Sequence, residues 1–98
     1  MVYILGNLIV DFLLYIEEFP VEARALQGVS HVAIGPGGAC NVAIMASRFG
    51  LPVSSLGEVG DDYFAQIVLS GLKREGIQTG QVIMNKRGST PVAGVLVD

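Results

Sequence analysis

The chain has 98 residues, of which 51% are hydrophobic and 15% are charged, and its formal net charge is −3. This composition excludes intrinsic disorder, because the apolar side chains can offset the entropy cost of ordering, and the length excludes two separately folded domains. The acidic balance, with no basic cluster larger than two adjacent residues, excludes a nucleic-acid partner recognised by charge.

The N-terminal part of the chain predicts two strands. Residues 2–5 are a short apolar run that Gly6-Asn7 ends, which is typical of a strand buried in a parallel sheet. Residues 9–16 are apolar except for Asp11 and predict a second strand, in which Asp11 shares one face with Leu13. An unpaired buried carboxylate is costly, so Asp11 is either a surface residue of an edge strand or a residue with a hydrogen-bonding partner.

The same stretch does not predict a targeting or membrane segment. Residues 1–16 contain no basic residue, Asn7 and Asp11 interrupt the apolar run, and a membrane helix needs about 20 apolar residues. We therefore expect no membrane contact. The single cysteine, Cys40, cannot form an internal disulfide, which fits a reducing, cytoplasmic location.

The middle of the chain predicts a strand and a helix around a Gly-rich turn. Residues 25–34 are expected to pair antiparallel with residues 9–16, in a small sheet separate from the main one. Residues 35–38, Gly-Pro-Gly-Gly, are expected to end that strand. The helix that follows ends at Gly50, and its apolar stripe is expected to face the core. This stripe consists of Val42, Met45, Ala46 and Phe49.

The second half of the chain alternates strand and helix. Residues 53–56 predict a buried strand and residues 57–60 a loop. Asp61-Asp62 is placed to cap the following helix, which ends at Gly76. The remaining strand-like runs are residues 81–84 and 91–97. This order predicts an α/β fold with a parallel core and a few extra strands.

The Gly-rich turn is the place where the backbone can come close to a ligand, because its glycines have no Cβ and a helix start follows. A tight connection without a ligand explains the same residues. A dinucleotide fingerprint fails because Cys40 stands where the third glycine belongs. Asn41 is interpreted as a helix cap, His31 as a structural residue, and Cys40 as a packing residue or a reactive thiol.

The turn and its neighbours also resemble a known family. Residues 37–43, Gly-Gly-Ala-Cys-Asn-Val-Ala, with Gly50 and Gly60 at fixed distances after them, are similar to the N-terminal signature of the PfkB, or ribokinase-like, carbohydrate kinases. The likeness extends over the whole chain and covers about the first third of a typical member. It implies a ribokinase-like three-layer α/β sandwich, of which residues 1–98 form a single incomplete N-terminal part with a small β lid.

The resemblance implies an ATP-dependent kinase that phosphorylates a hydroxyl group of a sugar or nucleoside. It implies that the lid strands, at about residues 9–16, 25–34 and 91–97, close over the acceptor and can join two copies in a homodimer. The residues implied to hold the acceptor are Asp11, Gly37, Gly38 and Asn41.

ATP and Mg²⁺ are the cofactors that the family implies for its full-length members. The catalytic base and the Gly-rich anion hole of that family lie beyond residue 98, so no catalytic, ATP-binding or metal residue is assigned here. The 98 residues alone are expected to be inactive. Ala65 replaces a glycine of many members, which is a minor change because alanine is the better helix former.

Two other interpretations stay open. The chain could be a non-catalytic short protein that binds a sugar or dimerises through its lid strands. A nucleotide-binding Rossmann half is the weaker alternative. A kinase fragment predicts an exposed apolar patch and an open sheet edge, because the strands and helices that would cover them are missing.

Overall fold

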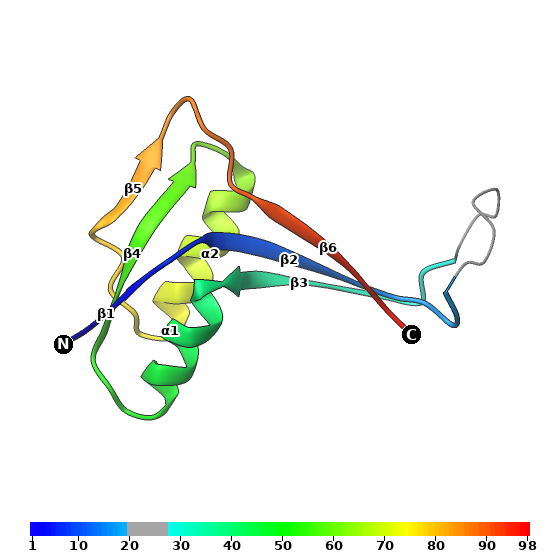
Figure 1. Ribbon diagram of the computed structural model, residues 1–98, viewed down its shortest axis with the longest axis horizontal. Helices are drawn as coiled ribbons and strands as arrows, with labels where there is room; N and C mark the ends of the chain where they lie inside the picture. The colour runs from blue at the N-terminus through cyan, green and yellow to red at the C-terminus, as the bar shows by residue number, and fades with distance from the viewer. Residues whose placement is uncertain (20–27) are drawn as a thin grey trace.

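The computed structural model describes residues 1–19 and 28–98, which form two three-stranded sheets and two helices (Figure 1). One sheet is parallel and has the strand order β1-β4-β5. Its strands are β1 (Val2–Leu5), β4 (Val53–Gly60) and β5 (Val82–Asn85). The predicted α/β class with a parallel core is confirmed.

The second sheet has the order β3-β2-β6. Its central strand β2 (Leu8–Tyr15) pairs antiparallel with β3 (His31–Gly38) and parallel with β6 (Val92–Val97). This sheet projects from the rest of the molecule as an arm (Figure 1), and the molecule measures 49 × 34 × 18 Å.

Helices α1 (Ala39–Arg48) and α2 (Tyr63–Arg74) lie on one face of the parallel sheet (Figure 1). Successive parallel strands joined by right-handed crossovers place their helices on the same side. The core forms where this face meets the helices and the start of β2. Its buried residues are Leu8, Val10, Cys40, Ala43, Val53, Val59, Ala65, Val68, Leu72 and Ile77.

The other face of the parallel sheet is apolar and open. Leu5 is 78% exposed there, and Tyr3 and Ile83 are exposed as well. Among the described residues, helices cover only the opposite face, so these residues supply two of the three layers of a sandwich. Neither described helix is long and apolar enough to span a membrane.

Two segments predicted to be turns are strands. Residues 35–38 continue β3 to Gly38 and pair with β2, so the prediction that they end the strand was wrong. Pro36 is accommodated because β3 is an edge strand, where one side of the backbone needs no partner. Residues 57–60 belong to β4, because β5 pairs with them.

The strand expected at residues 25–34 therefore lies further along the chain, at His31–Gly38. Residues 28–30 are not in a strand, and residues 25–27 of that prediction lie outside the described residues.

The apolar stripe of α1 does not face the core. Val42, Met45 and Phe49 are exposed, with Phe49 at 79%, whereas Cys40 and Ala43 are buried. The helix packs through its small residues, which let it approach the sheet closely. The prediction was wrong because both faces of this helix are apolar, and apolar spacing alone does not tell which face is buried.

Asp62 joins the start of α2 to the segment that leads into β6. One carboxylate oxygen accepts a hydrogen bond from the N–H of Ala65 (2.9 Å), as an N-cap does, and the other accepts one from the N–H of Thr90 (2.8 Å). The hydroxyl of Thr90, which is 4% exposed, accepts a hydrogen bond from the N–H of Gly60 (2.9 Å). These contacts, called the Asp62 latch below, fix where β6 begins.

The hydrogen bonds of the latch, above all the one from the Thr90 backbone N–H, lower the pKa of Asp62 from its ordinary value. A carboxylate whose pKa is lowered on folding stabilises the fold above its unfolded pKa of about 4. That contribution is lost as the pH falls through the lower, folded-state pKa.

We predict that Asp62→Ala lowers the urea midpoint of unfolding at pH 7 and that the difference from the unsubstituted protein shrinks at acidic pH. Asp61→Ala is the matched control, because Asp61 is exposed and accepts no side-chain hydrogen bond within the described ranges. Equal midpoints for the two variants at pH 7 would contradict the latch.

Candidate functional site

The carboxyl group of Asp11 lies directly over the backbone of Gly37. Asp11 on β2 is the cross-strand partner of Gly35, and Gly37 is the next residue of β3 on the same face. A Cβ atom placed on Gly37 would overlap the Cγ and both carboxylate oxygens of Asp11. Glycine at position 37 is therefore what leaves room for the acid.

Asp11 and Asn41 line the same cavity, which has a volume of about 260 Å³. Asp11 comes from β2 and Asn41 from the first turn of α1, so the turn from β3 into α1 brings an acid and an amide together. The other lining residues are small or apolar: Leu13, Ala33, Ile34, Gly35 and Pro36.

The Asp11 carboxylate is half-buried, and no group among the described residues donates a hydrogen bond to it. A carboxylate offers two oxygens, each able to accept more than one hydrogen bond. These acceptors are available to hydroxyl groups of a molecule in the cavity. The interpretation of Asp11 as a surface residue of an edge strand was wrong, because β2 is the central strand of its sheet. A hydrogen-bonding partner for this carboxylate stays a prediction.

Asn41 is not the cap of α1, so that interpretation was wrong. The N-cap is Gly38, which has no side chain, and no side-chain hydrogen bond caps this helix. Asn41 is the third residue of the helix, and its amide is not used for capping. An amide both donates and accepts hydrogen bonds, which suits it to a hydroxyl ligand.

Gly38 has a local role at the junction of β3 and α1. Its φ of 61° lies in the left-handed region, and a Cβ there would come within 2.5 Å of the Asn7 carbonyl oxygen. The same oxygen accepts a hydrogen bond from the Ala39 N–H (2.8 Å). Gly37 and Gly38 are not among the lining residues of the cavity. They position Asp11 and Asn41, which do line it.

Cys40 and His31 do not contribute chemistry to the cavity. Burial raises the pKa of the Cys40 thiol, and the nearby charge of Asp11 raises it further, so the thiol stays protonated at neutral pH. This favours Cys40 as a packing residue. His31 lies near the far end of the arm, with its ring 5.3 Å from that of Tyr15.

The Gly-rich segment is not a phosphate-binding loop. Residues 35–38 are paired with β2 along their length, so their backbone forms a sheet and not an open anion nest. The residues present do not fit the triphosphate of ATP, and no group of three metal-ligating side chains occurs in the described part of the chain.

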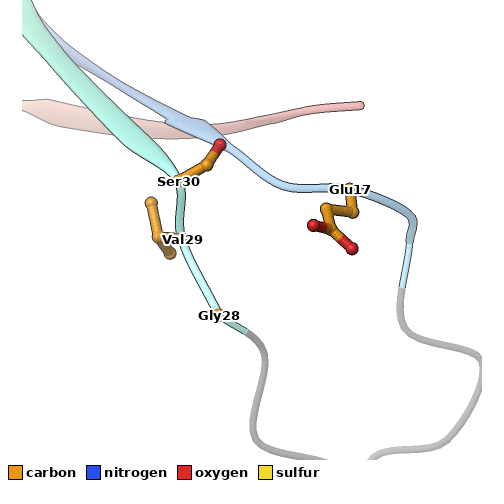
Figure 2. A pocket seen from close by; sticks show the side chains of 4 residues that line it. All are labelled: Glu17, Gly28, Val29 and Ser30. Atoms are coloured by element: carbon orange, nitrogen blue, oxygen red, sulfur yellow. The ribbon is translucent and has the colours of Figure 1, made fainter.

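A second hollow lies at the far end of the arm, between the ends of β2 and β3. Figure 2 shows the Glu17 side chain directed into it and Val29 directed away; Gly28 and Ser30 complete the lining. The Ser30 hydroxyl donates to the Tyr15 carbonyl oxygen (3.1 Å). Among the described residues Glu17 is the one acid of this hollow, and the Ser30 hydroxyl is engaged with the backbone, so the hollow is a weaker candidate than the cavity of Asp11 and Asn41.

Gly35 lines the cavity although it is not among the acceptor residues that the sequence implied. It belongs to the Gly-rich segment, but only the register of β3 against β2 places it beside Asp11. Once that register is known, cross-strand pairing places Gly35 on the same face of the sheet as Asp11.

Comparison with known proteins shows the family to which this chain is similar. Residues 1–98 match the family described as pfkB family carbohydrate kinase. A ribokinase of Schizosaccharomyces pombe is 32% identical over 103 residues, covering 99% of this chain and 32% of that protein. A nucleoside kinase of Methanothermobacter thermautotrophicus is 31% identical over 94 residues, covering 95% of this chain and 30% of that protein.

Solved structures show the same fold. The structure of Arabidopsis thaliana ribokinase complexed with ribose and ATP matches with a TM-score of 0.82 at 20% identity, covering 99% of this chain and 32% of that one. The chain spans about a third of the length of these relatives. The predicted ribokinase-like fold is confirmed over that third.

We predict that Gly37→Ala lowers the free energy of unfolding by about 1–3 kcal/mol, because the new methyl group overlaps the Asp11 carboxyl. Gly94→Ala is the matched control: it lies on β6 of the same sheet, and a Cβ there meets no atom within 4 Å. Urea denaturation of both variants measures the difference. Equal stability of the two would contradict the close contact.

Proposed function

Because the chain belongs to the pfkB family of carbohydrate kinases, we propose that residues 1–98 form the acceptor-binding portion of an ATP-dependent kinase. The complete enzyme transfers the γ-phosphate of ATP to a hydroxyl group of a sugar or nucleoside. The names of the relatives, ribokinase and nucleoside kinase, support this acceptor class. The cytoplasm is the proposed location, and a single buried cysteine is compatible with it.

The observation that carries the proposal is the convergence of Asp11 and Asn41 on one cavity. The carboxylate accepts hydrogen bonds from two neighbouring hydroxyls, and the amide can donate to one oxygen and accept from another. Two such groups from different elements fix both the position and the orientation of a polyhydroxylated acceptor. Gly37 and Gly38 serve the acceptor indirectly, by placing Asp11 and α1.

Phosphoryl transfer depends mainly on positioning and on electrostatic stabilisation. The described residues supply the positioning of the acceptor, and we assign no catalytic base and no nucleotide or Mg²⁺ ligand among them. ATP supplies the phosphoryl group when bound, at residues outside this chain. Residues 1–98 alone are accordingly proposed to be inactive.

A homodimer through the arm is part of the proposal. Val32, Ile34 and Leu96 are exposed on the face opposite Asp11, and β3 and β6 are edge strands. Exposed apolar strands with open edges pair readily with a second copy. Sedimentation equilibrium of the complete polypeptide tests this, since a monomer at all concentrations would contradict it.

We predict that Asp11→Ala and Asn41→Ala each raise the KM for the acceptor by about 10- to 100-fold in the complete polypeptide, because each removes hydrogen bonds to hydroxyls. The KM for ATP should stay the same. Steady-state kinetics with ribose, fructose and adenosine measures both constants, and Asp61→Ala serves as the control for loss of an exposed acid.

Equal loss for the acceptor and for ATP would contradict the roles assigned to these residues. Turnover by residues 1–98 alone would contradict the proposed division of the site. A polypeptide that binds sugar without turnover would support the non-catalytic alternative instead.

A further inference from the structure

Gly35 is a glycine that neither the backbone nor the packing requires. Its φ does not lie in the left-handed region, where Gly38, Gly50 and Gly76 are found. A Cβ on Gly35 would meet no heavy atom within 4 Å, whereas one on Gly37 would overlap Asp11. The fold alone therefore does not explain the glycine at position 35.

Gly35 lies where a side chain would compete with a ligand. It is the cross-strand partner of Asp11, so a substituent at Gly35 points to the same face of the sheet as the carboxylate. Gly35 also lines the cavity of about 260 Å³. Because Gly35 has no side chain, the space beside the Asp11 carboxyl group stays open.

The space over Gly35 is apolar. Apart from Asp11 and Asn41, the lining residues that share the face of Asp11 are Leu13, Ala33 and Gly35, whereas Ile34 and Pro36 line the cavity from β3 but alternate to the opposite face. On the other side of Asp11, its partner in β6 is Ala93, which is also small. The surroundings of Gly35 on this face are therefore apolar except for Asp11.

We propose that Gly35 determines acceptor specificity by leaving room beside Asp11 for an apolar ring face or substituent of the acceptor. This inference rests on the proposed function and extends it. Hydroxyl groups of the acceptor bind Asp11 and Asn41, and its less polar part lies over the bare backbone of Gly35. An acceptor such as a nucleoside uses this space more fully than a free sugar does.

The test is Gly35→Val in the complete polypeptide, assayed with ribose, fructose and adenosine. Valine suits a strand, so the fold should persist. Filling the pocket should raise the KM for adenosine by at least about tenfold, the rise for the free sugars should be smaller, and the KM for ATP should not change. Gly35→Ala should give an intermediate effect and covers the case in which valine impairs folding.

Gly94→Val is the matched control. Gly94 lies in the same sheet and also has open space at its Cβ position, but it pairs with Phe12 on the face opposite Asp11. This variant should leave every KM within about twofold of the unsubstituted protein, because it does not touch the cavity. Comparable urea midpoints for the Gly35 and Gly94 variants show that any difference in KM is not a folding defect.

The outcomes separate this inference from the proposed function. Unchanged acceptor KM values in both Gly35 variants, or equal rises for adenosine and the free sugars, overturn the role of Gly35 while the effect of Asp11→Ala still supports acceptor binding. An Asp11→Ala variant with an unchanged acceptor KM overturns the proposed function itself. A complete polypeptide that neither binds nor phosphorylates any of the three compounds overturns both.

Discussion

The candidate site depends on one contact, that of the Asp11 carboxyl group with the bare backbone of Gly37. Because residue 37 has no Cβ, the Asp11 carboxyl group can lie against the backbone of β3, and Asp11 lines the cavity. The next residue, Gly38, uses its left-handed φ to turn the chain into α1, which carries Asn41 to the same cavity. Two adjacent glycines thus help to place an acid and an amide from different elements on one cavity.

The arm that carries Asp11 is held to the α/β body at two places. The start of β2 is part of the core through Leu8 and Val10, and the Asp62 latch fixes the start of β6. The arm is therefore packed against the body near these two places, while its far end carries exposed apolar residues such as Val32 and Leu96. The cavity of Asp11 and Asn41 lies on this anchored part of the arm, because Asp11 follows Val10 in β2.

Much of the fold was predictable because it rests on local signals. The cap at Asp62 and the helix ends at Gly50 and Gly76 follow from backbone chemistry that a few residues determine. The strand character of residues 35–38 and 57–60 was missed because their pairing partners are distant in sequence. The buried face of α1 was also missed, since both of its faces are apolar.

The most direct measurement is a crystal structure of the complete polypeptide with an acceptor that it phosphorylates. We expect hydroxyl oxygens of the acceptor within hydrogen-bonding distance of both the Asp11 carboxylate and the Asn41 amide. An acceptor bound elsewhere, for example in the hollow beside Glu17, or one that touches only one of these two residues, would contradict it.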